Sequence, residues 1–540
     1  MKSAVRIRRR AALTAGASGF IAAGLIWGPA PAQAMQPPGG GSAPRPAAAA
    51  DRTSGPAADE DAPLLDAGSP DGKRFRATGR LVGGGGTTCT ATLVHAPGRP
   101  DPGAKALVLS NGHCADDTMG TDDVVIDKPA PRGWDFTPAY FHDNAPEHKK
   151  FTVERIVYAT MKDIDVSVLR LSATYGDLAK LNVTPRTLAA DRPAPGTALR
   201  AAHAPADGVE PGQQYLRLST CQVTASRVAL HEHTWLWRDS TRTDCLGISG
   251  GSSGGPVTTA RDTGRLVGML NTIVTPGYLG CGLGRPCEGS GKGLVVPRDN
   301  AAYVTPVDAV GSCLEGAVLR LHKKGCRLDR GEQVNVTAQG QHTRSDTADG
   351  PARWDAHVTP GHAGRHSYAA FKSGPFGVVD CTRPDGYGTP RRLTSAGLDH
   401  KELLPAQDNL YVLCVAGGPD ATLKGDDWAK SLEHPSYAYA RVDNTPPSVA
   451  PKADIQLFDG EDAFYWVRPG YAPWEITGYK VKYGPRATTD CADTTGYRDY
   501  LGIPTTLRAA DGPWTYCAIG SDSAGNATPP ATFAVPSATR

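Results

Sequence analysis

Apolar and polar residues alternate over short runs along most of the chain, and segments rich in glycine, proline, asparagine and aspartate separate these runs. Clear examples occupy residues 87–94, 106–110 and 165–171. An apolar side chain at every second position predicts a β-strand with one buried face. Because the runs are short and recur, and the chain contains 63 glycines and 45 prolines, we expect an all-β protein of many turn-linked strands.

The C-terminal part of the chain shows this alternation in two further groups. The first predicts a β-sandwich-like domain over residues 315–442, with the stretch through Cys326 as an alternative end of the preceding domain. Residues 443–447 contain two prolines and predict a short, stiff linker. Residues 448–540 resemble a fibronectin type III or immunoglobulin-like domain in their strand rhythm, which implies a core that contains Trp466.

Length and charge narrow the classes of function. The 540 residues allow two to four domains. The net charge is only +2, and lysine and arginine are scattered beyond the N-terminus, so we expect no nucleic-acid partner.

The N-terminus has the features of a secretory signal peptide over residues 1–34. A basic start precedes an apolar stretch of small residues, and Ala32-Gln33-Ala34 matches a cleavage site. The apolar stretch is too short and too rich in glycine to span a bilayer. We therefore expect a secreted, extracellular protein without a membrane partner after signal removal. Residues 35–74 are rich in proline, alanine and glycine, and we expect them to form a disordered pro-segment or linker.

Twelve cysteines, an even number, fit an oxidising compartment. They occur as close neighbours along the chain, and we expect each to pair with its neighbour, although spacing alone does not fix connectivity. The pairs are Cys89 with Cys114, Cys221 with Cys245, Cys281 with Cys287, Cys313 with Cys326, Cys381 with Cys414, and Cys491 with Cys517.

The stretch from Ser249 to Val257 contains a serine surrounded by glycines and followed by an apolar strand. Glycines permit a sharp turn in which the backbone N–H groups of Gly251 and Ser253 point into one concavity, where they can stabilise an oxyanion. A flexible glycine-serine linker is the alternative, but linkers rarely sit inside apolar material. Ser253 as a nucleophile requires a base and an orienting acid elsewhere in the chain.

Two residues at strand ends have the required chemistry. His113 follows the apolar run 106–110, where it can act as a general base, or be an ordinary surface histidine. Asp165 stands at the start of the alternating run 165–171, where a buried carboxylate can accept the second N–H of a histidine. Asp163 is the alternative acid, and we expect it to be more exposed.

These residues occur in the order His113, Asp165, Ser253, and the motifs around them resemble the chymotrypsin/trypsin superfamily of serine endopeptidases, in its secreted bacterial branch. The motifs are Cys89–Leu93, Ser110–Cys114, Asp165–Leu169, Gly251–Pro256 and Leu266–Gly268. The resemblance covers residues 75–314. It implies two six-stranded β-barrels, a disulfide between Cys89 and Cys114, and the three catalytic residues in the cleft between the barrels.

Departures from the family pattern concern activation and specificity. Ser252 replaces an aspartate that pairs with a new amino terminus in digestive members, so we expect no activation by such an ion pair. By analogy, the specificity pocket has Gly247 at its floor with Ile248 beside it, while Asp244 is an alternative floor residue. The substrate-pairing strand is then Asn271, Thr272 and Ile273, whose backbone pairs with an extended peptide.

Together these features predict a secreted serine endopeptidase that acts on protein or peptide substrates without a cofactor or metal. His231-Glu232-His233 shares residue types with metal sites, but no third ligand is evident, and a surface hairpin is favoured. The C-terminal modules would bind an extracellular protein or polysaccharide. The alternatives are a catalytically inactive protease fold that serves binding or adhesion, and an esterase with the same triad.

Overall fold

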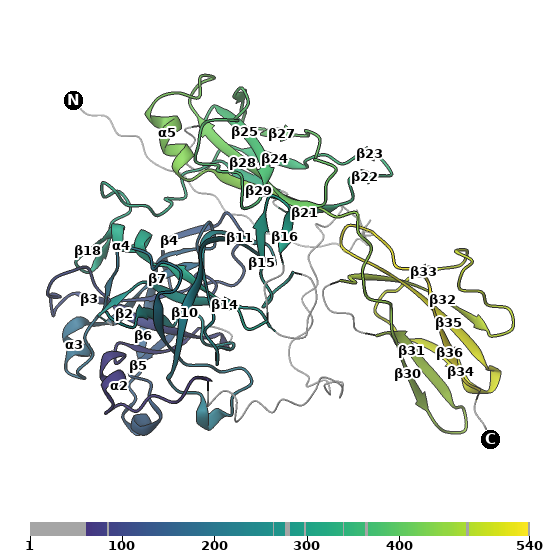
Figure 1. Ribbon diagram of the computed structural model, residues 1–540, viewed down its shortest axis with the longest axis horizontal. Helices are drawn as coiled ribbons and strands as arrows, with labels where there is room; N and C mark the ends of the chain where they lie inside the picture. Colours follow the sequence, from purple (N-terminus) through teal and green to yellow (C-terminus); the bar gives the residue numbers. More distant parts are fainter. Residues whose placement is uncertain are drawn as a thin grey trace, which may run out of the picture. The chain divides into compact units, whose positions relative to one another are not determined.

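The computed structural model describes residues 61–83, 86–262, 264–275, 281–295, 299–337, 340–361, 366–470 and 475–537 (Figure 1). The expected signal peptide lies outside these residues. The described part of the chain is nearly all β-structure, as expected. Within it, no helix is long and apolar enough to cross a membrane.

Seven strands between residues 78 and 174 form the first barrel. They are β1 (Thr78–Val82), β2 (Thr88–Val94), β3 (Lys105–Ser110), β4 (Val124–Pro129), β5 (Asp135–Pro138), β6 (Phe151–Thr160) and β7 (Val166–Thr174). Their order is β4-β6-β5-β1-β2-β3-β7, and an additional pairing between β6 and β7 closes a ring of six strands. Alternate residues fill the ring: Leu81, Leu93, Val108 and Leu169 belong to one buried cluster.

The second barrel is built in the same way. Its strands are β9 (Ala198–His203), β10 (Arg217–Glu232), β11 (Trp235–Thr243), β12 (Pro256–Thr259), β14 (Gly268–Ile273) and β17 (Ala302–Pro306). They follow the order β11-β17-β14-β12-β9-β10, and pairing of β10 with β11 closes the ring. Strands β15 (Cys287–Ser290) and β16 (Gly293–Val295) extend the sheet from β10. The expectation of two six-stranded barrels is thus confirmed.

Short elements connect and flank the barrels. The helical ones are α2 (Pro70–Arg74), η2 (His142–Glu147), α3 (Tyr175–Ala179), η3 (Pro211–Gln213) and α4 (Asp308–Cys313). The strand pairs are β8 (Thr187–Leu188) with β13 (Arg265–Leu266), and β18 (Leu314–Glu315) with β19 (Val318–Leu319). Leu319 and Leu328 belong to the same buried cluster as Leu107 and Val166 of the first barrel. The segment through residue 328 thus packs against the first barrel.

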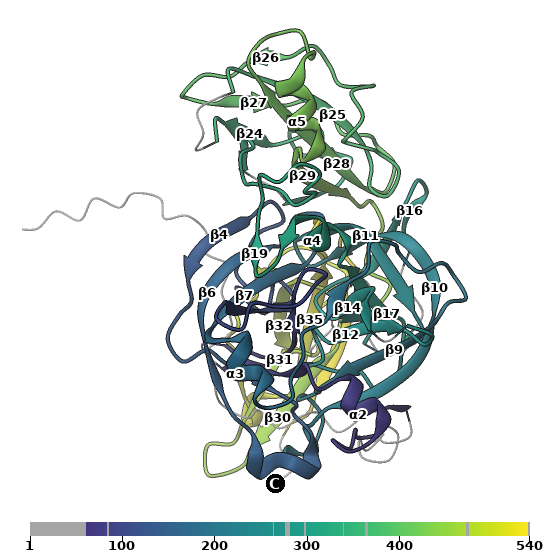
Figure 2. The same ribbon diagram turned by 90° about the vertical axis from the view of Figure 1, so that its left-hand side faces the viewer.

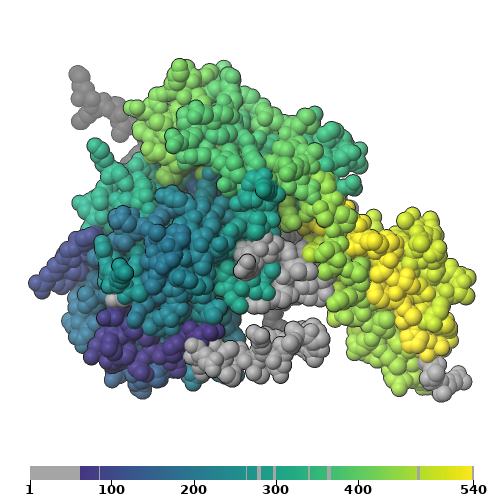
Figure 3. All heavy atoms as spheres, viewed as in Figure 1, coloured from purple at the N-terminus to yellow at the C-terminus, as the bar shows by residue number. Residues whose placement is uncertain are grey.

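The segment before the first barrel is ordered from residue 61, which corrects the expectation of disorder through Arg74. Leu65 is only 5% exposed and shares a cluster with Phe75, Ala202 and Leu216. The Leu65 N–H also donates to the Leu216 carbonyl at 2.8 Å. Helix α2 lies beside β9 (Figure 2), and the early residues of the described chain form part of the molecular surface (Figure 3). A few apolar side chains in a proline-rich stretch are enough to fix it against a barrel.

Residues 335–442 form a second β-region of two sheets. One sheet contains β20 (Asn335–Thr337), β24 (Ala356–Thr359) and β27 (Leu398–His400). The other contains β21 (Gly340–Thr343), β29 (Ser436–Val442), β28 (Asn409–Gly418), β25 (Tyr368–Pro375) and β26 (Arg391–Arg392). The pair β22 (Asp346–Thr347) and β23 (Gly350–Pro351) and helix α5 (Asp426–Glu433) complete it. Both sheets contribute to one core, as in a sandwich: Val336 and Val358 pack with Leu413 and Ala438.

The last β-region also has two sheets around one core. The first contains β30 (Ala453–Phe458), β31 (Phe464–Pro469) and β34 (Thr505–Arg508), and the second contains β33 (Arg498–Asp499), β32 (Gly478–Pro485), β35 (Trp514–Ser521) and β36 (Ala531–Val535). The turn η4 (Ala509–Asp511) follows β34. Tyr465, Val467 and Tyr516 are buried between the sheets. Trp466 is 43% exposed, so its expected place in the core is wrong: the alternation of β31 turns Tyr465 and Val467 inward instead.

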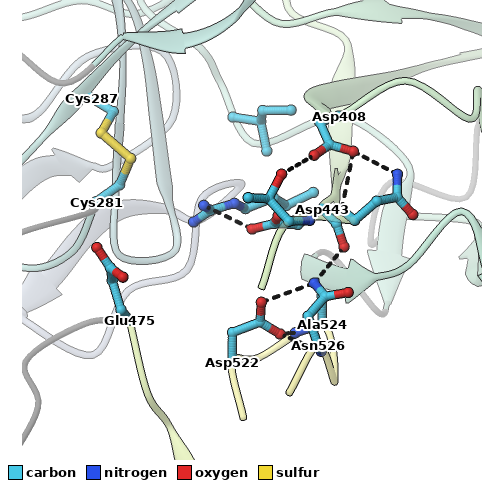
Figure 4. A network of polar contacts seen from close by, with 12 residues as sticks. Cys281, Cys287, Asp408, Asp443, Glu475, Asp522, Ala524 and Asn526 are labelled. Carbon is cyan, nitrogen blue, oxygen red and sulfur yellow. Dashed lines mark hydrogen bonds and ion pairs between the residues drawn. A yellow bond between two sulfur atoms is a disulfide. The ribbon is translucent and has the colours of Figure 1, made fainter. Parts of the chain in front are cut away.

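The six expected disulfides are all present, including the bond between Cys89 and Cys114. Side chains hold the first residues of the linker 443–447 (Figure 4). The Asn444 side chain and the Thr445 hydroxyl donate to Asp408, and the Asn526 amide donates to the Asp443 carbonyl at 2.8 Å.

Candidate active site

His113 and Asp165 lie at the ends of neighbouring strands. Strands β3 and β7 pair with Ser110 opposite Ser167, so the residues just after β3 meet those just before β7. Nδ1 of His113 donates to Oδ2 of Asp165 at 2.6 Å. The Asp165 side chain is fully buried, whereas the His113 side chain is 24% exposed. This bond fixes the proton on Nδ1 and leaves Nε2 of His113 as the acceptor nitrogen, as a general base requires.

The backbone around this pair holds the carboxylate in place. The other Asp165 oxygen accepts the N–H groups of Gly112 at 2.5 Å and His113 at 3.1 Å. The Asn111 side chain donates to the Asp165 carbonyl at 2.9 Å, and the Ser167 hydroxyl donates to the Asn111 carbonyl at 2.7 Å. The sequence did not indicate these roles of Asn111 and Ser167, although Asn111 belongs to the histidine motif Ser110–Cys114.

Electrostatics favour the protonated form of His113. Burial disfavours the charged imidazolium, but attraction to Asp165 and the hydrogen bond with it outweigh this effect and raise the pKa of His113 above its usual value. Glu232 and Asp117 act in the same direction. Asp163, the alternative acid, is half-buried and forms an ion pair with Arg238 at 3.1 Å. Asp165 is therefore the carboxylate that orients His113.

Ser253 lies where the second barrel meets the ends of β2 and β3. Its carbonyl accepts the Thr90 N–H at 2.8 Å, and its hydroxyl donates to the Asn271 carbonyl at 3.2 Å. The next residue, Gly254, has a φ of +81°, and a Cβ there would lie 2.3 Å from Oγ of Ser110. Only glycine permits this approach, which brings the serine loop against the strand that leads to His113. In this structure the Ser253 hydroxyl bonds to Asn271 and not to His113.

The peptide planes around Ser253 have defined orientations. The Gly250 carbonyl accepts the N–H groups of Ala206 at 2.7 Å and Asp207 at 3.0 Å. Because C=O and N–H point in opposite directions across a trans peptide, the Gly251 N–H points away from these partners. The Ser252 carbonyl accepts the Gly255 N–H at 2.9 Å, which orients the Ser253 N–H in the same way.

These two N–H groups have the properties of an oxyanion hole. Within the described chain, neither Gly251 N–H nor Ser253 N–H donates to another protein group. The Thr90 hydroxyl also fixes the loop by donating to the Gly251 carbonyl at 2.9 Å. Free donors on a rigid backbone are suited to stabilise a negative oxygen.

The expected substrate-pairing residues form the end of β14. Pairing between β12 and β14 covers only Gly268 and Met269, while β17 pairs with β14 as far as Ile273. No described strand therefore pairs with one edge of Asn271, Thr272 and Ile273, which leaves it open to an extended peptide.

The residues expected in the pocket lie at different depths. Gly247 has a φ of +72°, and a Cβ there would lie 2.5 Å from Cβ of Ala62. The N-terminal segment thus contacts the expected pocket floor. Ile248 is half-buried against the core of the second barrel. Asp244 is exposed, and its carboxylate accepts the Gln222 N–H at 2.7 Å.

Two groups of residues have side chains of the types that bind metal ions. Ligand atoms of Cys89, His113 and Cys114 lie within 4.8 Å of one another, but the two sulfurs are bonded to each other and are not available as thiolates. The expected hairpin is present, because β10 turns into β11 at His233, which is exposed. His231 and Glu232, just before the turn, are each only 3% exposed. They are buried because β10 continues between β11 and β15 at this point.

Comparison with known proteins agrees with this architecture. The family model of the trypsin-like peptidase domain matches residues 89–269, and this region has a trypsin-like peptidase fold. A search of curated proteins found no match.

Three solved structures are each similar to a part of this chain. The MamO protease domain from Magnetospirillum magneticum is 15% identical, over 45% of this chain and 98% of that one, with a TM-score of 0.30. The thermostable serine protease AL20 from an extremophilic microorganism is 18% identical, over 43% and 92%, with a TM-score of 0.28. Protease Anisep from Arthrobacter nicotinovorans is 18% identical, over 43% and 90%, with a TM-score of 0.28.

Proposed function

We propose that this protein is a secreted serine endopeptidase in which His113, Asp165 and Ser253 form the catalytic triad. The main support is the buried Asp165 carboxylate, which lies 2.6 Å from Nδ1 of His113. In the described chain, the loop that contains Ser253 also has two backbone N–H groups without a protein acceptor. The matched family model supports peptide-bond hydrolysis as the reaction. Six disulfides fit an oxidising, extracellular location.

The proposed reaction follows the established logic of such a triad. Rotation of the Ser253 side chain away from the Asn271 carbonyl directs its hydroxyl to Nε2 of His113. The Ser253 oxygen attacks the peptide carbonyl carbon while His113 accepts the hydroxyl proton, and the N–H groups of Gly251 and Ser253 stabilise the resulting oxyanion. His113 then protonates the leaving amine. Water, activated by the same histidine, hydrolyses the acyl-enzyme and restores Ser253.

We further propose three domains, at residues 75–314, 315–442 and 448–540, of which the last is of fibronectin type III or immunoglobulin-like type; the packing of Leu319 and Leu328 on the first barrel supports Cys326 as the alternative end of the first domain. Its exposed Trp466 lies next to Phe458, with ring centroids 4.7 Å apart, and next to Phe464, at 6.2 Å. An exposed aromatic group supports a binding role for this module toward an extracellular protein or polysaccharide.

The test is hydrolysis of a denatured protein by the mature, oxidised enzyme, with fragments mapped by mass spectrometry. We expect cleavage and fluorophosphonate labelling by the wild type, and neither by Ser253→Ala. The control Ser226→Ala removes a half-buried hydroxyl that donates to the Pro193 carbonyl, and should leave both unchanged. Aliphatic fragment ends would support Ile248 and Ile273, and basic ends would support Asp244. A wild type that neither cleaves nor labels would instead favour an inactive binding protein.

A further inference from the structure

The residue before the nucleophile belongs to a buried chain of hydrogen bonds. Oγ of Ser252 lies 2.8 Å from Nδ1 of His203, in β9, and Nε2 of His203 lies 2.9 Å from Oγ of Ser219, in β10. The Ser219 hydroxyl in turn donates to the Leu246 carbonyl at 2.6 Å. Ser252 is 1% exposed, and His203 and Ser219 are fully buried.

The Leu246 carbonyl at one end of this chain determines which group donates in every hydrogen bond. A carbonyl oxygen only accepts, so the single hydroxyl proton of Ser219 is used on Leu246. Oγ of Ser219 must then accept from Nε2–H of His203. A neutral imidazole that donates from Nε2 accepts at Nδ1, so the Ser252 hydroxyl donates to it. Oγ of Ser252 finally accepts the Ser249 N–H at 3.3 Å.

The chain is complete only when His203 is uncharged. Burial lowers the pKa of His203 to about 3, and the nearby positive charge of Arg217 contributes in the same direction. A protonated ring would offer two donors, and Nδ1 would then lose the hydroxyl proton of Ser252 as a partner. In the described chain both nitrogens of the imidazole are thus used by serine hydroxyl groups.

We propose that His203 is a positioning residue, which holds Ser252 and thereby fixes the peptide planes that present Gly251 N–H and Ser253 N–H to the substrate. This role rests on the proposed function. An uncharged chain of hydrogen bonds then supports the nucleophile loop through Ser252. The digestive members of the resembled family have a charged aspartate at this position. His203 touches no substrate and acts only through Ser252.

The first test does not depend on activity. In protein labelled with ¹⁵N-histidine, the His203 signals are assigned by their loss in His203→Asn. We expect an unprotonated Nδ1 and a protonated Nε2 from pH 5 to pH 8. A protonated Nδ1 or a charged ring in this range would overturn the proposed chain.

The second test separates positioning from stability. We expect His203→Leu to lower kcat/KM by about 10- to 100-fold, because small misplacement of reacting groups costs this much. Affinity for a peptide boronate, which mimics the tetrahedral intermediate, should fall by the same factor. His203→Asn keeps an acceptor for Ser252 and should retain more activity. The control His400→Leu removes a fully buried histidine from another β-region and should leave kcat/KM and boronate affinity unchanged.

The double variant His203→Leu/Ser252→Ala decides between the two roles. It removes both partners of one bond, so its stability should exceed that of His203→Leu. Activity should remain low if His203 positions the loop, whereas recovery of activity with stability would overturn the inference. A wild type that labels with fluorophosphonate while His203→Leu keeps full kcat/KM would overturn only this inference. A wild type that neither labels nor cleaves would overturn the proposed function, and with it any role of His203 in it.

Discussion

The Thr90 hydroxyl donates to the Gly251 carbonyl at 2.9 Å, so one side chain of the first barrel holds the nucleophile loop of the second. The same hydroxyl oxygen accepts the Ala204 N–H at 3.0 Å. Thr90→Val keeps the shape but leaves this buried N–H without a partner. We expect a loss of about 1–3 kcal/mol in unfolding free energy, together with a lower kcat. Thr90→Ser keeps the hydroxyl and should preserve both the stability and kcat. Urea unfolding measures the first, and steady-state kinetics measure the second.

Glu232 should contribute to the position of the acid limb of the pH profile, after the larger effect of Asp165. Burial raises the pKa of Glu232 to about 7, and its negative charge helps to raise the pKa of His113. Activity requires neutral His113, so kcat/KM should fall as pH decreases through the raised pKa of that histidine. With a pKa of about 7, Glu232 carries only part of its negative charge near neutral pH. Glu232→Gln removes that part, lowers the pKa of His113, and should move the acid limb by a small amount to lower pH. The exposed Asp117 raises the pKa of His113 less than Glu232 does, so the control Asp117→Asn should shift the acid limb by a smaller amount. An unchanged acid limb in Glu232→Gln would contradict this account.

Buried neutral histidines should make the fold sensitive to acid. The pKa values of His203 and His231 are lowered by burial to about 3, against an ordinary value of 6.5. Between these values the unfolded chain binds more protons than the folded one, so the unfolding free energy rises with pH. Their contribution should be complete above pH 6.5 and be lost as pH falls toward 3. Urea unfolding from pH 4 to pH 8 measures this slope, which should be smaller in His203→Asn.

The ordered N-terminal segment should contribute to stability. Leu65 is buried against Phe75 and Leu216, and Leu65→Ala should lower the unfolding free energy by about 2–5 kcal/mol. The exposed Leu501, in the last β-region, offers the matched control Leu501→Ala with little effect. Equal thermal midpoints for these two variants would show that the segment does not stabilise the barrel.

Much of this architecture was predictable from the sequence because its determinants are local. Alternating runs identified the strands, and His113, Asp165 and Ser253 stand directly at strand or loop positions with distinctive neighbours. The chain of Ser252, His203 and Ser219 was missed, since it depends on the register that places β9 beside β10. Trp466 was misplaced for a related reason: its strand alternates correctly, but the sequence does not state which of its two faces meets the other sheet.

The open edge of β14 has a consequence for the linker between the last two β-regions. A peptide that pairs with Asn271–Ile273 must be extended and must offer its own backbone N–H groups. Pro446 and Pro447 have none, and the Asp408 and Asn526 side chains restrain the linker's first residues. If the protein cleaves peptides as proposed, a substrate that must pair as a strand would not include this linker, and the last two β-regions would stay joined during self-digestion.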